Sequence, residues 1–295
     1  MRTDHVKGLL ITAIGGLTLT LDIPLIRLSG GETWTVLMVR SGATFLAALL
    51  IWTVWRALSP NAPSLIPGRV GLAVAALYGF GSIFFVTAVY HTSTANLVFI
   101  LAFNTVFSAL LSWIFLKEKL RYPTLLAIAT MVVGVLIIVG DSIGTGNLFG
   151  DLMALLNAFC IAAAITISRA SGKDMGFTSL VGVIFPFSVA IVMVAKGGYF
   201  LESPWWIILN GAIVMPISFY CLATGTRYIA GPEVAMFYLL ETVLAPIWVW
   251  MIFYEVPSRN SLIGGLILIV ALVAHSIWQL VDARRRRAAG LPEAA

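Results

Sequence analysis

The chain has 295 residues, of which 60% are hydrophobic and 11% are charged, and its net charge at pH 7 is +5. Soluble domains carry roughly 25% charged residues, so the composition excludes an ordinary soluble protein and indicates an integral membrane protein. The positive charge requires no nucleic-acid partner, because lysine and arginine also flank the spans of membrane proteins.

Ten apolar segments follow one another along the chain, separated by short connections. A helix needs about 20 apolar residues to cross the hydrocarbon core, and continuously apolar runs favour helices over the alternating strands of a barrel. The connections leave no room for a soluble domain. The predicted spans are 8–28, 34–56, 69–90, 93–116, 122–140, 150–169, 177–196, 204–227, 232–254 and 259–281.

The first segment is too long for a signal-peptide core and lacks a small-residue cleavage site, so we expect a retained helix. Cys160 and Cys221 fall inside spans, where cysteine is usually a small buried apolar residue and not half of a disulfide.

Lysine and arginine predict the orientation, because they gather in cytoplasmic segments. With the N-terminus inside, 14 of them lie on the cytoplasmic side and only Arg27, Lys196 and Arg259 on the outer side. We therefore expect both termini in the cytoplasm and the protein in the bacterial inner membrane. The four arginines at 284–287 are typical of a stop-transfer anchor in contact with anionic lipid.

The chain contains an internal repeat of five predicted helices. At an offset of 137, Trp113 aligns with Trp250, Glu118 with Glu255, and Asn104 with Glu241; at an offset of 142, Arg27 aligns with Arg169. We interpret Glu118 and Glu255 as the ends of two helices, useful for aligning the halves. The predicted units are a first repeat at 1–140, a linker at 141–151, a second repeat at 150–281 and a basic tail at 282–295.

Because five is odd, the second unit enters the membrane in the opposite direction to the first. The sequence thus predicts an all-α integral membrane protein with ten transmembrane helices in two inverted five-helix repeats. Secondary transporters often have this design, with the substrate site near the midplane between the halves. A purely structural duplication is the alternative.

Several stretches resemble the EamA repeat of the drug/metabolite transporter superfamily. They are "TSTANLVFILAFNTVFSALLSW" (92–113), the Leu-x-Glu that ends at Glu118, the helix with Gly134 after it, and "GDLMALLNAF" (150–159). The size and general character suggest the bacterial aromatic amino-acid exporters within it. The resemblance implies alternating access through a central cavity surrounded by helices 1, 3, 4, 6, 8 and 9. The usual proline of helix four is absent around Asn104, and Val256 stands where a basic residue is common.

Only Asp22, Arg40 and Glu241 are charged residues well inside predicted spans, where charges are costly and usually functional. Asp22 and Arg40 lie six residues from the outer ends of consecutive helices, roughly 9 Å deep. Their equal depth predicts an ion pair, either structural or part of an outer gate or substrate site.

Glu241 lies near the middle of helix nine, and its repeat counterpart Asn104 near the middle of helix four. The pair could bind a substrate ammonium group or a proton. The alternative is a neutral glutamic acid that is hydrogen-bonded between helices.

Glycine and proline predict hinges at corresponding places in the two halves. Gly79 and Gly81 lie at the centre of helix three, Pro216 aligns with Gly79, and Pro246 adds a kink in helix nine. Aromatic and polar side chains near these positions predict a cavity for a small amphipathic solute. The candidate lining residues are Tyr78, Phe103, Asn157, Tyr220 and Tyr238.

We expect a secondary transporter that exports amino acids, aromatic or other apolar ones favoured. The alternatives are an exporter of drugs or other small metabolites and, remotely, a membrane enzyme or scaffold. No ATP-binding loop, zinc motif or cysteine–histidine cluster is present in the sequence, so we expect no cofactor, no metal and no catalysis. The expected partners are a small-molecule substrate and membrane lipids, with the protein working as a monomer.

Overall fold

The computed structural model describes residues 2–59, 64–117, 120–173, 175–225, 228–229 and 231–288. Within these ranges every regular element is a helix, apart from one isolated bridge between Gly31 and Leu201. Glu118, used in the repeat alignment, and Lys119 and Arg227, counted among the cytoplasmic basic residues, lie outside the described residues.

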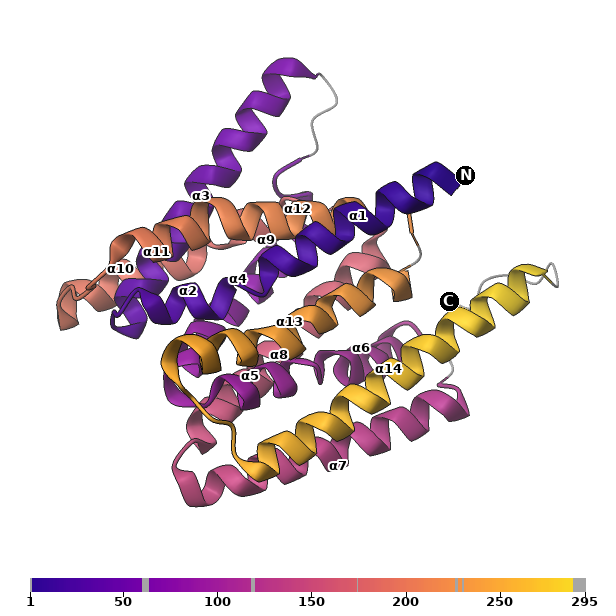
Figure 1. Ribbon diagram of the computed structural model, residues 1–295. Helices are drawn as coiled ribbons and strands as arrows, with labels where there is room; N and C mark the ends of the chain where they lie inside the picture. Colours follow the sequence, from indigo (N-terminus) through magenta and orange to yellow (C-terminus); the bar gives the residue numbers. More distant parts are fainter. Residues whose placement is uncertain are drawn as a thin grey trace.

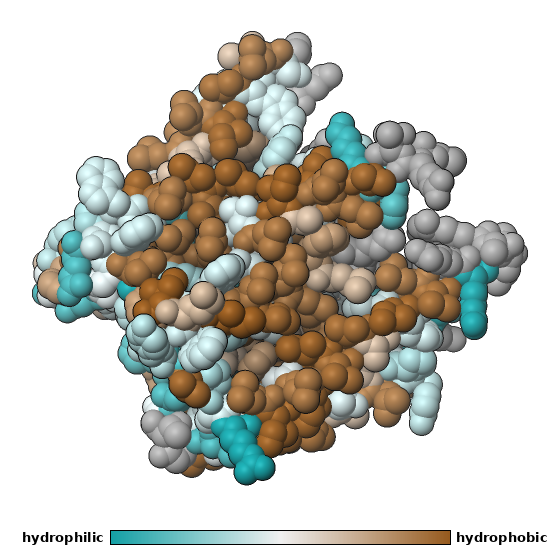
Figure 2. Space-filling view, in the orientation of Figure 1, coloured by the Kyte–Doolittle hydropathy of each residue, from teal (hydrophilic) through white to brown (hydrophobic). Residues whose placement is uncertain are grey.

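Ten helical segments in the described ranges are long and apolar enough to cross a membrane, which confirms the predicted fold. They are His5–Leu28, Thr33–Leu58, Gly68–His91, Thr94–Phe115, Tyr122–Ile143, Leu148–Ser171, Thr178–Gly197, Pro204–Leu222, Met236–Phe253 and Arg259–Asp282. Figure 2 shows apolar residues covering the middle of one side of the molecule, with hydrophilic side chains gathered towards its two ends.

Helices α1 to α7 form the first half of the molecule. They are α1 Arg2–Leu19, α2 Asp22–Leu28, α3 Thr33–Leu58, α4 Gly68–His91, α5 Thr94–Leu101, α6 Asn104–Phe115 and α7 Tyr122–Thr145. The second half contains α8 Leu148–Ser171, α9 Thr178–Gly182, α10 Ile184–Gly197, α11 Pro204–Leu209, the π-helix η1 Asn210–Val214, α12 Met215–Gly225, α13 Gly231–Phe253 and α14 Arg259–Ala288.

Four of the ten spans are interrupted. Breaks separate α1 from α2, α5 from α6, and α9 from α10, and the π-helix η1 interrupts the eighth span. Such breaks expose backbone groups that a regular helix would satisfy internally, so they are tolerated in a membrane only where protein or water surrounds them.

The packing of the helices follows the inverted symmetry. The third span, α4, packs along the sixth, α8, and the equivalent pair places the eighth span, α12, along the first, α1. Spans that align with each other also pack together, as α7 does with α14, α3 with α10, and α5 with α13 (Figure 1). Each half therefore buries its apolar surface against the other, and the two halves form one bundle.

Both ends of the chain lie at one end of the bundle, which we call the terminal face, and the opposite end is the far face (Figure 1). The second half of α3 diverges from the other helices towards the terminal face. Leu50 is 66% exposed and Leu58 82%. No residue of α3 beyond Ala48 is buried.

The stretch 141–151, expected to be a linker, is largely helical. Helix α7 continues to Thr145 and α8 begins at Leu148. Gly146 separates them with φ of 80°, a left-handed conformation that glycine adopts without strain and that commonly ends helices. Asp151, which the predictions place both at the end of the linker and at the start of the sixth span, lies inside α8.

Candidate substrate site

Asp22 and Arg40 form an ion pair inside the bundle. The Nη2 group of Arg40 donates to both carboxylate oxygens of Asp22, at 3.1 and 2.9 Å. The two residues are 3% and 5% exposed. Removing two charges from water is costly, and the cost is offset only when their remaining polar atoms are also hydrogen-bonded.

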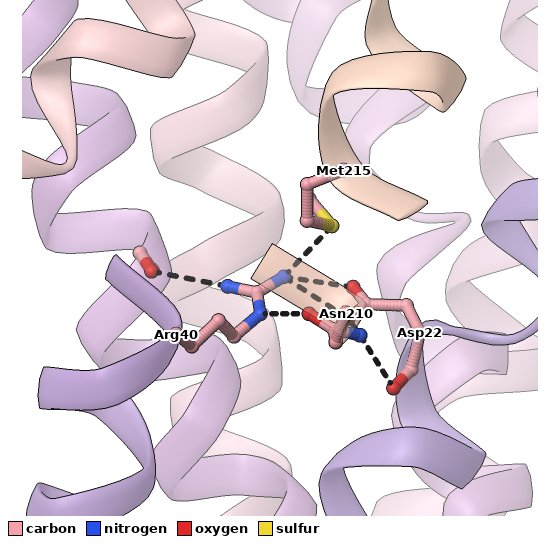
Figure 3. A network of polar contacts seen from close by, with 5 residues as sticks. Asp22, Arg40, Asn210 and Met215 are labelled. Atoms are coloured by element: carbon pink, nitrogen blue, oxygen red, sulfur yellow. Dashed lines mark hydrogen bonds and ion pairs between the residues drawn. The ribbon is translucent and has the colours of Figure 1, made fainter. Parts of the chain in front are cut away.

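Asn210 supplies the additional hydrogen bonds, as Figure 3 shows. Its amide oxygen accepts from Nε of Arg40 at 3.0 Å. Its amide nitrogen donates to Oδ1 of Asp22 at 2.7 Å and to the Asp22 carbonyl at 3.1 Å. Our sequence analysis missed Asn210. The only signal is an asparagine within the apolar stretch "WIILNGAIVM" (206–215).

Interrupted helices bring these three side chains together. Asp22 is the first residue of α2, directly after the break at Thr20 and Leu21, and Asn210 is the first residue of η1. A Cβ atom on Gly211 would lie 2.5 Å from the Arg40 carbonyl oxygen, so only glycine lets η1 approach α3 this closely. Single π-helical turns often occur at functional sites.

The rest of the Arg40 guanidinium contacts two further helices, α4 and α12. Nη1 donates to Oγ of Ser82 on α4 at 3.4 Å, and Nη2 also points to the sulfur of Met215 at 3.2 Å (Figure 3). The guanidinium carbon lies 5.5 Å from the centre of the Phe85 ring, a distance typical of a cation–π contact. Arg40 is thus held from several directions.

Glu241 lies next to this network. It is close enough to Asp22 and Arg40 to interact electrostatically with both, and no side chain in the described ranges hydrogen-bonds its carboxylate. Trp248, two turns further along the same face of α13, donates its indole N–H to Oγ1 of Thr20 at 3.1 Å. The face of α13 that carries Glu241 therefore lies against the break between α1 and α2.

Tyr78 and Tyr238 complete the central group. Tyr238 interacts electrostatically with both Tyr78 and Glu241, and all three lie deep in the molecule. Tyr238 is nevertheless 42% exposed, and Glu241 is half-buried. Both side chains therefore keep part of their surface accessible.

The other predicted lining residues occupy different surroundings. Asn157 is buried where α8 meets α4, and Phe103 is buried with its ring 5.2 Å from that of Phe107. Asn104, half-buried, is the first residue of α6, directly after the break in the fourth span. Tyr220 is 52% exposed and packs on Trp55, 6.4 Å between ring centres, near the diverging part of α3.

The predicted hinges differ between the two halves. Helix α4 is continuous through Gly79 and Gly81, and a Cβ atom at these positions would lie 2.9 Å from Phe185 and Asn157 respectively. These glycines therefore allow close helix packing. Pro216 is the second residue of α12, just after η1, whereas Pro246 lies inside the continuous helix α13.

Polar contacts close the far face. Arg27, at the end of α2, forms an ion pair with Glu255 and donates to the carbonyls of Val89 and Thr92. Glu255 also accepts from the backbone N–H of Thr94 at 2.7 Å. These contacts join the first span, the turn between the third and fourth, and the end of the ninth, so they link the two halves.

A second buried network lies behind this closure. Asp151 is 1% exposed and accepts hydrogen bonds from Thr92 and Ser142. Asn96 donates to Ser142 at 3.0 Å and accepts from Ser261. Four spans therefore meet through hydrogen bonds near the far face. At the terminal face, by contrast, α6 carries only two buried residues and α3 diverges, so the helices pack less tightly at that end.

The fold and this buried polar centre place the protein among integral membrane proteins built from two inverted halves. Many secondary transporters have this design. The chain belongs to the EamA-like transporter family. The sequence pattern of this family matches the chain twice, over residues 6–140 and 148–277. The chain is thus related to membrane transporters along almost its whole length.

Two bacterial proteins share detectable sequence similarity. One is the uncharacterized transporter sll1164 of Synechocystis, 22% identical over 222 residues, which are 68% of this chain and 63% of that protein. The other is the uncharacterized transporter YdfC of Bacillus subtilis, 26% identical over 172 residues, 56% of each protein. The similarity thus spans less than two thirds of either relative.

One solved crystal structure has the same fold. It matches 95% of this chain and 98% of its own, with a TM-score of 0.62 and 16% sequence identity. At this identity the likeness shows the fold alone.

Proposed function

We propose that the protein exports amino acids with aromatic or other apolar side chains by alternating access. The observation that carries the proposal is Glu241, a carboxylate without a hydrogen-bonding partner among the described residues, beside two tyrosines and deep in the molecule. The substrate's ammonium group would bind Glu241, and its apolar side chain would lie against Tyr78 and Tyr238.

The Asp22–Arg40–Asn210 network supports the orientation of the substrate. Its hydrogen bonds fix Arg40 beside Glu241, so a positive and a negative group stand together, as the two ends of a zwitterion require. Asn104 and Asn157 are the further polar groups that we assign to this cavity. Ligand pockets commonly combine an apolar wall with a few such polar groups.

The contrast between the two faces of the bundle supports alternating access. The far face is closed by the Arg27–Glu255 pair, whereas α3 diverges near the terminal face. With both termini in the cytoplasm, as the distribution of basic residues predicts, this conformation would receive substrate from the cytoplasm. We place the protein in the bacterial inner membrane, working as a monomer because one chain contributes the whole site.

Counterflow in proteoliposomes tests the proposal. Vesicles that contain the purified full chain and unlabelled phenylalanine should accumulate labelled phenylalanine transiently and saturably. Glu241→Gln should reduce this flux at least tenfold, because the ammonium group loses its counter-charge. Glu32→Gln, which removes an exposed carboxylate, is the matched control and should behave as the unmodified protein.

Substrate analogues separate amino acids from a second candidate class, cationic drugs or other metabolites, which a carboxylate beside aromatic rings would also suit. Phenylalanine, tryptophan and leucine should compete with the labelled substrate, and 3-phenylpropionate, which lacks the ammonium group, should not. Competition by phenylalanine amide alone would favour the cationic class. Absence of saturable flux for every amino acid would overturn the proposal.

A further inference from the structure

The far-face ion pair contains a carboxylate-binding site made by the first half of the chain. Arg27, at the end of α2, binds one oxygen of the Glu255 carboxylate through Nη1. The backbone N–H of Thr94, the first residue of α5, donates to the other oxygen at 2.7 Å. A guanidinium group and the N-terminus of a helix both favour negative charge. Groups from the first and fourth spans therefore hold Glu255 as they would hold a ligand.

Two polar atoms of this site have no partner in the described part of the chain. They are Nε of Arg27 and Oγ1 of Thr94, and both are buried. Thr94 is only 1% exposed, and its hydroxyl belongs to the residue whose N–H binds Glu255. Buried donors without partners are unfavourable. A carboxylate can accept about four hydrogen bonds, and Glu255 accepts one at each oxygen, so the site can bind a carboxylate more completely than it binds Glu255.

The site has supports that do not involve its occupant. Nη2 of Arg27 donates to two backbone carbonyls, at the end of α4 and in the turn before α5, each at 3.2 Å. The side chain of Ser93 caps α5 by accepting from the backbone N–H of Asn96 at 3.2 Å. In the same turn, the hydroxyl of Thr92 donates to the buried Asp151 of α8. The arginine and the helix N-terminus therefore do not depend on Glu255 for their positions.

The occupant is held less firmly than the site. Helix α13 ends at Phe253, and Tyr254 has φ of 56°, a left-handed conformation that is costly for a bulky residue. Tyr254 is also 82% exposed, so packing in the core does not offset that cost. The only other non-glycine residue with positive φ in the described ranges is Lys117, one repeat offset of 137 residues earlier. A strained and exposed segment therefore carries Glu255 into the site, and such strain often marks a functional element.

We propose that the far-face site is a second binding site for the exported amino acid, which occupies it on leaving the protein. The amino acid's carboxylate replaces that of Glu255 on Arg27 and Thr94 and uses the two donors that Glu255 leaves free. Its ammonium group binds the displaced Glu255. The zwitterion thus separates the ion pair that closes the far face, because each of its ends binds one partner of the pair. The identity of the ligand rests on the proposed function, whereas the preference for a carboxylate rests on the far-face contacts alone.

Carboxylate rescue of Glu255→Ala tests the site without transport. The substitution empties the site, so the melting temperature of the full chain in detergent should fall. Sodium 3-phenylpropionate, which lacks the ammonium group that the central site requires, should restore several degrees saturably, compared with sodium chloride at equal ionic strength. The neutral 3-phenylpropionamide should not. The unmodified protein should show no such shift, because Glu255 fills its site.

Thr94→Val distinguishes a guest carboxylate from Glu255. The substitution removes a hydroxyl that Glu255 does not use, so this variant should melt no lower than the unmodified protein. In Glu255→Ala the same change should weaken the apparent affinity for 3-phenylpropionate several-fold, and Arg27→Gln should abolish the rescue. Thr130→Val is the matched control and should change neither property, since the Thr130 hydroxyl donates to the Leu126 carbonyl of its own helix at 2.9 Å.

Flux measured from each side tests the assignment to the amino acid and requires no change at Glu255. Sealed right-side-out and inverted membrane vesicles present labelled phenylalanine to opposite faces of the protein. Thr94→Val should raise the KM several-fold when phenylalanine is presented at the far face and leave the KM at the terminal face unchanged. A purely structural role of the hydroxyl would change both values or neither, and either result would overturn the second site.

The outcomes also separate this proposal from the proposed function. Saturable phenylalanine flux without rescue of Glu255→Ala, and with no effect of Thr94→Val on either KM, would overturn the second site and leave amino-acid transport in place. Rescue by 3-phenylpropionate without flux of any amino acid would overturn the proposed function and the identity of the ligand, but not the binding of a carboxylate. Equal rescue by the amide would show that the space is merely filled and would overturn the site.

Discussion

Three residues from three different spans hold the charges of the central site in place. Asp22, Arg40 and Asn210 together satisfy the carboxylate, the Nε–H and two of the remaining guanidinium hydrogens. Breaking a buried ion pair by removing one partner is strongly destabilising, because the other charge remains buried alone. We therefore expect loss of either Asp22 or Arg40 to reduce both the stability of the fold and the transport activity.

Asp22→Asn tests this coupling at the level of one residue. The substitution keeps the size of the side chain but removes the carboxylate that accepts both Nη2 hydrogen bonds of Arg40, and we expect a loss of about 3–5 kcal/mol. The melting temperature in detergent should fall by several degrees and phenylalanine counterflow should be lost. The double variant Asp22→Asn with Arg40→Gln should recover most of the stability, because two neutral side chains then replace the ion pair, but not the flux. Equal stability of both variants would contradict a buried pair.

At the scale of elements, the π-helix η1 determines where Asn210 points. An extra residue in the turn changes the direction of the side chains around it, and Asn210 at its start reaches Asp22 across 188 residues of sequence. The close approach of η1 to α3 depends on Gly211, whose missing side chain leaves room for the Arg40 carbonyl. The π-helix η1 and helix α3 are thus packed directly against each other.

Gly211→Val should separate η1 from α3. The added Cβ would stand 2.5 Å from a backbone oxygen, which cannot move aside as a flexible side chain can, so we expect overpacking to cost about 1–3 kcal/mol. Thermal unfolding should shift to lower temperature, and phenylalanine flux should fall because Asn210 moves away from Arg40. Gly140→Val is the matched control, since nothing lies within 4 Å of the added atom there. A similar loss in both variants would indicate a general effect of valine in these helices.

At the scale of the whole molecule, alternating access requires the contacts of the far face to break and re-form. The Arg27–Glu255 pair joins the first half of the chain to the second across 228 residues. Its repeat counterpart at the other face would involve Arg169, which donates to Ser112 at 3.3 Å, while the counterpart of Glu255 lies outside the described residues. Mutation of the Arg27–Glu255 pair can therefore test how the far face is held closed.

Arg27→Ala should open the far face. Val36 is fully buried near that face, so a cysteine at position 36, in a chain whose Cys160 and Cys221 have been replaced, should resist a membrane-impermeant maleimide. Addition of Arg27→Ala should increase the labelling rate several-fold, because the ion pair and two carbonyl contacts are lost. Arg259→Ala removes an exposed arginine from the same face and should leave the rate unchanged. Unchanged labelling in Arg27→Ala would contradict its role in the closure.

Part of the site could be predicted from the sequence. Asp22 and Arg40 stood out as charges at equal depth on consecutive spans, and the ion pair between them is present. Gly79 and Gly81 suggested hinges, because a sequence does not distinguish a glycine that bends a helix from one that admits a neighbour. Asn210 gave no sign of its partners, since an asparagine within an apolar run is compatible with many surroundings.

The sequence by itself determined the number of spans, the inverted arrangement of the two halves and the family. These properties depend on local hydropathy and on an internal repeat, because the bilayer imposes the same length and apolarity on every span. Only the tertiary structure decided which helices break and that Asn210 joins the ion pair. Those features depend on packing between spans far apart in the chain, where fractions of an ångström at Gly211 or Thr20 decide which polar groups meet.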